Sequence, residues 1–261
     1  MFINSVDLKF SNRMSKKVDF DIFIRFLWRL TVIYVCFFYS LNGKAQIKKT
    51  MIACIGNSIT AGARLTNPEV ASYPAVLTAL LKENGYSNYE IKNFGVGGAT
   101  VLRFGKPNLW RVLDSLKNFP PDIVIIKAGT NETVGQPRFN WEHINEFEKD
   151  YSDYVAAIRK INPTCRIIIC SPLDMVIQTD GLSSERKEDL SLRRPRIWEL
   201  RKKIKKIAKN EHLFFLDLTK PFKGKTNLMT ISDGVHPNKD GYEYLAKLVF
   251  NFMVKREIVV Q

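Results

Sequence analysis

The chain has 261 residues, with 40 basic and 26 acidic side chains that give a formal net charge of +14, and it is 45% hydrophobic. This composition is typical of a globular protein and excludes a disordered chain, a collagen-like chain and a polytopic membrane protein. The length suits one large α/β domain or two small ones, with a core that needs neither disulfides nor metals. Four cysteines are too few for a disulfide framework in a chain of this size.

The first 45 residues differ from the rest of the chain. Basic residues precede a short apolar run at 30–41, and the small residue Ala45 follows it. This order is typical of a secretory signal peptide, and the run is shorter than the roughly 20 residues that span a bilayer. We therefore expect residues 1–45 to be removed, the protein to be exported to the periplasm or beyond, and membrane contact to occur only through this segment. The basic region is long for a signal peptide, and Met14 is an alternative start within it. The alternatives to export are an uncleaved anchor, or a mispredicted start ahead of a cytosolic protein.

Residues 46–261 are expected to form one domain of alternating strands and helices. Five short apolar runs have the composition of parallel strands covered on both faces; they lie at 51–55, 89–93, 122–127, 166–170 and 213–216. Apolar residues also repeat at helical spacing in three stripes, which begin at Tyr73, Ile197 and Tyr242. The alternation predicts a doubly wound parallel sheet inside a three-layer α/β/α sandwich.

A polar segment at 175–195 follows the fourth predicted strand. Its length and its Gly-Leu-Ser-Ser turn predict a long loop, either functional or a plain insertion. The helix expected after it, 194–210, carries basic residues around its apolar stripe. Such a helix can bind nucleic acid, but a single aromatic residue, Trp198, interleaves with the charges, so we interpret it as a solvated face and expect no nucleic-acid partner. A polyanionic glycan, an acidic sugar or a membrane surface is a milder alternative.

Four small polar motifs follow predicted strands or precede the last helix. In an open parallel sheet, ligands bind outside the carboxyl ends of the strands, so we expect these motifs to share one rim. They are Gly56-Asn57-Ser58-Ile59-Thr60, Asn93-Phe94-Gly95-Val96-Gly97-Gly98-Ala99-Thr100, Gly129-Thr130-Asn131-Glu132 and Asp233-Gly234-Val235-His236-Pro237. Together they supply a hydroxyl, glycine N–H groups, an amide, a carboxylate and an imidazole, which are the parts for acyl transfer through a serine nucleophile.

The four motifs, in this order, resemble those of the SGNH hydrolases, also called GDSL-type esterases. The resemblance extends over nearly all of residues 49–255 and implies a flavodoxin-like fold with a five-stranded sheet. The residues that give the family its name fall here on Ser58, Gly98, Asn131 and His236. The resemblance implies a catalytic set of Ser58, Asp233 and His236. It also implies an oxyanion hole formed by the Ser58 and Gly98 N–H groups and the Asn131 amide.

The residues themselves support the nucleophile and the base. A serine at a strand-to-helix turn places its backbone N–H where an oxyanion can use it, although the plainer role of Ser58 is to cap a helix that starts at Ile59. His236 follows Asp233 by three residues inside a turn, so the carboxylate can fold back to the imidazole Nδ1–H and fix the tautomer. The alternative is a surface turn that the aspartate merely caps. The other two histidines precede the fifth strand or begin a polar helix; they are His212 and His143.

The oxyanion-hole residues have plainer alternatives as well. Asn131 could be an ordinary loop asparagine, and with Glu132 and Thr133 it spells a glycosylation sequon, which we discount for a buried amide. Gly98 is preferred to Gly95 and Gly97 because the spacing in the family runs Asn-x-x-x-x-Gly. The other two glycines are expected to give the loop its conformational freedom.

Two departures from the family pattern concern the site. Asn57 stands where the family usually has aspartate, so the local hydrogen bonding is expected to differ. The stretch between Asn131 and Trp141 is longer than in carbohydrate acetylesterases of the family, including sialate O-acetylesterase-like ones. No spacing of metal ligands is present, and we expect no cofactor and no metal.

Three functions fit these observations. The first is a serine esterase that removes small acyl groups, above all acetyl groups, from a small-molecule or glycan ester. The second is a lipid-directed esterase of the same family, a lysophospholipase or a thioesterase. The third is a non-catalytic glycan-binding relative, against which the complete set of five site residues argues.

Overall fold

The computed structural model describes residues 25–31, 34 and 49–261. Residues 25–31 and 34 are helical and lie in one unit, Met1–Ile47, while the remainder forms a second unit, Lys48–Gln261. The predicted signal peptide therefore lies largely outside the described residues. Within the described ranges, no helix combines the length and the apolar character needed to cross a membrane.

The unit Lys48–Gln261 is built on a five-stranded sheet with the order β2-β1-β3-β4-β5, in which every neighbouring pair is parallel. The strands are β1 (Thr50–Gly56), β2 (Tyr89–Gly95), β3 (Ile123–Lys127), β4 (Arg166–Cys170) and β5 (Phe214–Leu216). All five predicted runs form strands, and their ends move by no more than two residues. The strand order reverses beside β1, which confirms the doubly wound, flavodoxin-like sheet.

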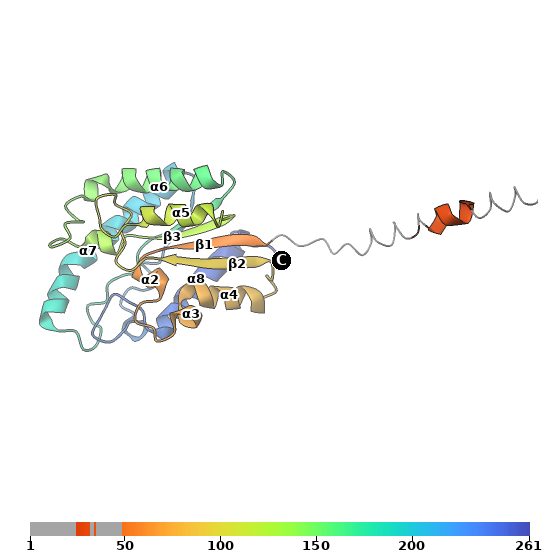
Figure 1. Ribbon diagram of the computed structural model, residues 1–261. Coiled ribbons are helices and arrows are strands. Elements are labelled where there is room, and N and C mark those ends of the chain that lie inside the picture. The colour runs from red at the N-terminus through yellow and green to blue at the C-terminus, as the bar shows by residue number, and fades with distance from the viewer. Residues whose placement is uncertain (1–24, 32–33, 35–48) are drawn as a thin grey trace, which may run out of the picture. The chain divides into compact units, whose positions relative to one another are not determined.

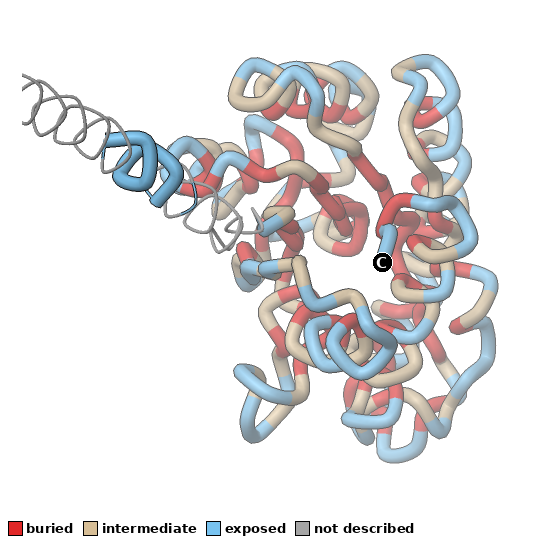
Figure 2. The backbone as a smooth tube through the Cα atoms, turned by 90° about the vertical axis from the view of Figure 1, so that its right-hand side faces the viewer, coloured by how far each residue is buried: buried red, intermediate tan, exposed pale blue. Residues whose placement is uncertain are grey.

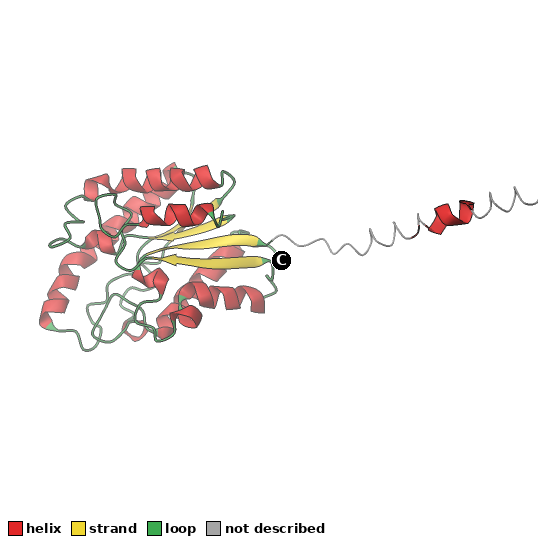
Figure 3. Ribbon diagram, viewed as in Figure 1, coloured by secondary structure: helices red, strands yellow, loops and turns green. Residues whose placement is uncertain are grey.

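Helices cover both faces of the sheet and complete the three predicted layers (Figures 1 and 3). On one side lie α2 (Ser58–Ala61), α3 (Pro68–Ala71), α4 (Tyr73–Glu83) and α8 (Lys239–Lys255). On the other side lie α5 (Val112–Lys117), α6 (Phe147–Ile161) and α7 (Ser184–Asn210). The three predicted helical stripes fall on α4, α7 and α8, and most residues of the stripes are buried.

The central strands are buried on both faces because their side chains alternate between two cores. Ile123 and Ile125 of β3 pack with α4 and α8, whereas Val124 and Ile126 pack with α5, α6 and α7. The buried stretches run through the middle of the unit, and exposed residues lie on the outer turns of the helices (Figure 2). This arrangement explains why the strands read as continuous apolar runs rather than as alternating ones.

The segment at 175–195 is not a loop throughout, so this prediction was wrong for its second half. Ser183 caps α7 by accepting a hydrogen bond from the Arg186 N–H at 3.1 Å, and the helix continues through Pro195 to Asn210. Proline normally ends or kinks a helix. Here burial of Leu190 in a small apolar cluster holds the first half in place, so tertiary packing outweighs the local signal.

The basic helix is also less solvated than the sequence suggested. Arg194 forms a two-pronged ion pair with the buried Asp174, and Arg201 does the same with Asp217. Lys203 and Lys206 both approach Glu148 of α6. Much of the positive charge of α7 therefore fastens the helix to its neighbours.

Candidate active site

The turn after β1 presents Ser58 at the carboxyl edge of the sheet. The side chain of Asn57 accepts a hydrogen bond from the Ile59 N–H at 3.1 Å and caps α2, which begins at Ser58. The expectation that Ser58 caps a helix starting at Ile59 was therefore wrong. Capping requires only a side-chain oxygen, which asparagine and aspartate share, so the departure at Asn57 preserves the turn. The Ser58 hydroxyl remains available for a partner across the site.

Close packing around this turn requires its glycines. A Cβ atom on Gly56 would lie 2.2 Å from Thr60 Oγ1 and 2.6 Å from the Lys127 carbonyl oxygen, and one on Gly95 would lie 2.2 Å from the Ala61 nitrogen. No larger residue fits at these distances. Gly95 therefore supplies space for the approach of β2 to α2, rather than the conformational freedom expected from the sequence.

Ser58, His236 and Asp233 form a hydrogen-bonded series. Ser58 Oγ lies 2.8 Å from His236 Nε2, and His236 Nδ1 lies 3.0 Å and 3.1 Å from the two carboxylate oxygens of Asp233. Because Nδ1 faces a carboxylate, the imidazole proton is held there and Nε2 is left to accept from the serine hydroxyl. The structure thus brings together the three residues predicted to carry the chemistry.

The Asp233 carboxylate is buried and well supplied with donors. Burial raises its pKa, but hydrogen bonds from the His236 ring and from the His236 and Val235 N–H groups outweigh that effect and hold the pKa well below its usual range. The turn is tight: Gly234 has φ +71°, and a Cβ there would lie 2.7 Å from Leu190 Cδ1. The carboxylate is therefore fixed in its ionised form beside the imidazole.

Gly98 and Asn131 lie on adjacent loops tied to each other at Ala99. The Asn131 amide donates to the Ala99 carbonyl at 2.8 Å with one of its two hydrogens. Among the three glycines of this loop only Gly98 has a positive φ, +72°, so the conformational freedom of glycine is required at the predicted oxyanion residue itself. Neither the Ser58 N–H nor the Gly98 N–H has a hydrogen-bond partner within the part of the chain that the structure describes.

Glu132 joins the two loops that are predicted to form the oxyanion hole, a role the sequence did not indicate. Its carboxylate is fully buried and accepts hydrogen bonds from the Val101 N–H at 2.8 Å and the Gly129 N–H at 2.9 Å. Burial raises the pKa of Glu132, and these backbone donors act against that rise. The glutamate therefore fixes the loop after β2 against the loop after β3.

Arg138 comes from the lengthened stretch before Trp141. Its guanidinium donates to the Gly98 carbonyl at 2.5 Å and to the Lys106 carbonyl at 3.2 Å. The insertion that departs from the family pattern therefore holds the peptide on the carboxyl side of Gly98. Nothing in the sequence signalled this contact, because it joins loops that are 40 residues apart.

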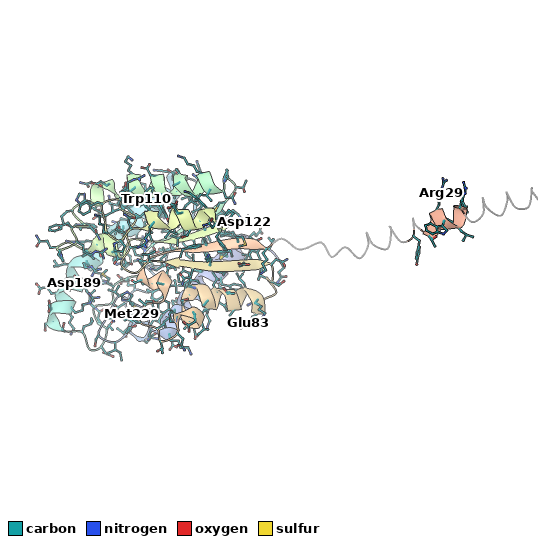
Figure 4. The ribbon with its side chains drawn as sticks, viewed as in Figure 1. Arg29, Glu83, Trp110, Asp122, Asp189 and Met229 are labelled. Atoms are coloured by element: carbon teal, nitrogen blue, oxygen red, sulfur yellow. The ribbon has the colours of Figure 1, made fainter. Side chains whose placement is uncertain are left out.

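Two further arginines flank the triad carboxylate. Arg64 Nε lies 3.0 Å from Asp233 Oδ2, and Arg186 Nε donates to the Asp233 carbonyl at 3.1 Å. Asp189 of α7, labelled in Figure 4, pairs with Arg186 at 2.8 Å and with Arg193 at 3.1 Å. The sequence gave no sign of these pairings, since each arginine lies outside the four motifs.

The other two histidines are remote from this chemistry. His143 stacks on Phe104 at a centroid distance of 3.6 Å and lies 2.8 Å from Glu146. His212 is exposed just before β5, at the opposite end of the sheet. Among the described residues, no group of three or more His, Cys, Asp or Glu side chains is placed to hold a metal ion.

A pocket of about 530 Å³ adjoins the triad. One wall comes from the segment after α2 and includes Arg64; the other comes from the segment before α8 and includes Met229, labelled in Figure 4, and Thr230. Both walls touch the triad, because Arg64 binds Asp233 and the Thr230 N–H donates to the His236 carbonyl at 2.9 Å. The volume is in the range of small-molecule sites.

A doubly wound α/β sandwich with this set of groups at the carboxyl edge of its sheet is typical of enzymes that hydrolyse carboxylic esters. Residues 54–244 match the GDSL-like lipase/acylhydrolase family, and the chain belongs to that family. The match covers all four motifs and confirms the family predicted from them.

The name of one curated relative includes a substrate. The acetylxylan esterase of Xylanibacter ruminicola is 27% identical over 220 residues, which make up 76% of this chain and 42% of that protein. The chain therefore spans less than half the length of this relative.

Solved structures share the fold at low sequence identity. The acetyl xylan esterase AlAXEase is 23% identical with a TM-score of 0.59, and the match covers 77% of this chain and 98% of that one. The lipase/acylhydrolase of Enterococcus faecalis is 23% identical with a TM-score of 0.61, over 79% and 96% of the two chains. Est24, a carbohydrate acetylesterase of Sinorhizobium meliloti, is 17% identical with a TM-score of 0.62, over 79% and 99%. At these identities the likeness shows the fold alone.

Proposed function

We propose that this protein hydrolyses acetyl esters of carbohydrates through Ser58. The observation that carries the proposal is the hydrogen-bonded series Ser58–His236–Asp233 beside two loops with free or partly free N–H donors. Family membership supports ester hydrolysis, and the name of the acetylxylan esterase relative supports an acetylated carbohydrate as the substrate.

In the acylation step, Ser58 Oγ attacks the acetyl carbonyl carbon while His236 Nε2 takes the hydroxyl proton. The Asp233 carboxylate stabilises the resulting imidazolium. The negative charge on the carbonyl oxygen is met by the Ser58 and Gly98 N–H groups and by the second amide hydrogen of Asn131. Collapse of the intermediate breaks the ester bond, and the sugar hydroxyl leaves with the proton from Nε2.

Deacylation repeats these roles with water. His236 takes a proton from a water molecule, which attacks the acetyl-Ser58 carbonyl. The same donors stabilise the second oxyanion, and the intermediate collapses to acetate and free Ser58, whose oxygen recovers its proton from Nε2. No step needs a redox cofactor.

A small acyl group fits the surroundings of the oxyanion loops better than a long alkyl chain. Arg138 places a partly buried guanidinium against the Gly98 carbonyl. An alkyl chain that displaced this contact would leave a charged group with fewer partners, which costs free energy. The pocket bounded by Arg64 and Thr230, whose walls contact Asp233 and His236 rather than Ser58, is large enough to hold a sugar.

The test compares p-nitrophenyl acetate, butyrate and decanoate, followed by acetate release from acetylated xylan, pectin and sialic acid. We expect turnover to fall steeply beyond about four carbons, since forcing extra methylenes into a filled site costs about 1–3 kcal/mol. Faster turnover of the decanoate would favour a lipid-directed esterase. Sugar binding with no hydrolysis of any ester would favour a non-catalytic glycan-binding protein.

We also infer export, with residues 1–45 acting as a signal peptide. The support is the order of basic, apolar and small residues in the sequence. Export would bring the enzyme to polymeric glycans that do not enter the cytoplasm.

A further inference from the structure

We propose that Arg64 is a positioning residue for the triad, which orients the Asp233 carboxylate and places a positive charge beside the Asp233–His236 pair. The proposal rests on the esterase mechanism above. It adds a residue that lies outside all four motifs and acts through Asp233 rather than on the substrate.

The two oxygens of the Asp233 carboxylate are held very differently. Oδ1 accepts hydrogen bonds from the Val235 N–H at 2.9 Å and the His236 N–H at 2.8 Å, so the local turn fixes it. Apart from the His236 ring, Oδ2 has only Arg64, whose Nε lies 3.0 Å away, as a partner among the described residues. Rotation of the carboxylate about its Cβ–Cγ bond is therefore stopped on one side by the turn and on the other by Arg64.

The backbone at Arg64 is shaped for this contact. Its φ of +73° lies in the left-handed region, which side chains other than glycine rarely adopt and which costs free energy. The neighbouring Ala63 is held on both sides: its N–H donates to the Ser58 carbonyl at 2.9 Å, and its carbonyl accepts from Tyr242 Oη at 2.9 Å. The anchored backbone therefore starts the Arg64 side chain from a fixed point within reach of Asp233, which its Nε contacts at 3.0 Å.

The other charged and titratable groups that face the Asp233–His236 pair come from α7 and α8. Arg186 of α7 has Nη2 3.9 Å from Asp233 Oδ1, and it shares the Asp189 carboxylate, 2.8 Å away, with Arg193. Tyr242 of α8 is uncharged at neutral pH, because burial raises the pKa of its phenol. Arg64 has no acidic partner besides Asp233 within the described chain. Of the two arginines beside Asp233, it is the one that no second carboxylate of the described residues contacts.

This charge has a predictable effect on the base. His236 accepts the Ser58 proton only when it is neutral, so the acid limb of kcat/KM marks its protonation in the free enzyme. A nearby cation disfavours a second positive charge on the imidazole. Removing Arg64 should therefore move the acid limb of kcat/KM to higher pH. Because the Arg64 side chain is 60% exposed, solvent screens the effect, and we expect a shift on the order of half a pH unit.

The experiment measures kcat and KM for p-nitrophenyl acetate from pH 5 to 9 in wild type, Arg64→Gln and Arg64→Lys, with melting temperature as a check on folding. Arg64→Gln removes the charge, and Arg64→Lys keeps it. Arg103→Gln is the matched control, because Arg103 is 52% exposed and pairs with the 6% exposed Asp150, just as Arg64 pairs with the 5% exposed Asp233.

We expect Arg64→Gln to move the acid limb of kcat/KM to higher pH and to lower kcat, with KM little changed. Arg64→Lys should restore the position of the limb, and Arg103→Gln should leave it where it is in wild type. The shift in Arg64→Gln should shrink at high salt, which screens an exposed charge. An unmoved limb in a folded Arg64→Gln enzyme would overturn the proposal. The proposal would also be overturned if the acid limb lay at the same pH in Arg64→Lys and Arg64→Gln. A purely structural role of Arg64 predicts lower stability without a change in the pH profile.

A second readout separates this proposal from the proposed function. The His236 imidazole can be titrated by NMR in the folded wild type and in Arg64→Gln without any substrate. A higher midpoint in the variant supports the role of Arg64 even if the ester assay fails. Equal midpoints reject that role even in an active esterase.

Discussion

Ser58 and His236 are 178 residues apart in the chain, yet Ser58 Oγ and His236 Nε2 lie 2.8 Å apart. The serine follows β1, an interior strand of the sheet, and the histidine precedes α8, which packs with α4 on one face. The Asn57 cap positions Ser58, and the turn that begins at Asp233 positions His236. The sheet has only to bring two preformed turns together, which limits the reorganisation required during the reaction.

Replacing Ser58 by alanine should abolish ester hydrolysis while leaving the fold intact. The side chain has His236 as its hydrogen-bond partner, and the α2 cap belongs to Asn57. Loss of a nucleophile typically lowers kcat by several orders of magnitude. The measurement is turnover of p-nitrophenyl acetate with the melting temperature of the same preparation. A folded variant with more than a few per cent of wild-type activity would remove Ser58 from its assigned role.

Asp233→Asn should reduce kcat by roughly 10²–10⁴ and should change the response of stability to acid. The folded pKa of Asp233 lies below its unfolded value, so the ionised carboxylate adds stability above about pH 4, and this contribution is lost as the pH falls below that value. The asparagine variant lacks this contribution. Thermal melts between pH 2 and 7 should show a smaller acid-induced loss of stability in the variant. Parallel curves for the two proteins would contradict the charged pairing.

Asn131→Ala should lower kcat by about 10²–10³ with little change in KM, because an oxyanion exists only in the transition state and the intermediate. The Ser58 and Gly98 N–H groups remain, so activity should fall without vanishing. The variant also loses the hydrogen bond to the Ala99 carbonyl, which should cost about 1 kcal/mol of stability. Steady-state kinetics and a melting curve on one preparation separate the two effects. A normal kcat with a lower melting temperature would make Asn131 a loop-holding residue only.

Lys127→Met should stabilise the protein at neutral pH. The Lys127 side chain is fully buried and its Nζ has no hydrogen-bond partner among the described residues; burial lowers its pKa to about 8. A lysine with a lowered folded pKa costs stability wherever it is charged, and this cost disappears as the pH rises from about 8 to 10.5. Methionine has a similar length and no charge, so the gain should be about 1–3 kcal/mol at pH 7.

The pH dependence provides the control for this substitution. Denaturant melts of wild type should show stability rising between pH 8 and 10.5 relative to Lys127→Met, and the two curves should converge at the upper end. A variant that is less stable than wild type at pH 7 would show that Lys127 has a favourable partner.

The protein recovered from its own host should begin at Gln46 and should be found outside the cytoplasm. Residues 1–45 have the charge and apolar pattern of a signal peptide. N-terminal sequencing of the protein from the culture medium and from the periplasmic fraction is the measurement. An intact N-terminus on a protein confined to the cytoplasm would reject export.

The sequence by itself determined the sheet and the four motifs on its rim. The strands were predicted correctly because a buried parallel strand is a continuous apolar run. The three residues predicted to form the triad lie together, and each comes from a short local turn, as Asp233 and His236 do three residues apart. Functional residues that lie a few positions apart in one turn can be recognised from a single sequence. The helix cap was expected at Ser58 but lies one residue earlier, at Asn57, because serine and asparagine are both preferred capping residues.

The tertiary structure alone decided which charges serve the site. Arg64, Arg138 and Arg186 lie outside every motif, and they reach Asp233 or Gly98 only because the fold brings their segments to the same rim. Likewise, α7 passes through Pro195 because Leu190 is buried, and its cations pair with aspartates that are distant in sequence. Long-range pairing depends on the geometry of the whole chain, and no local pattern encodes it.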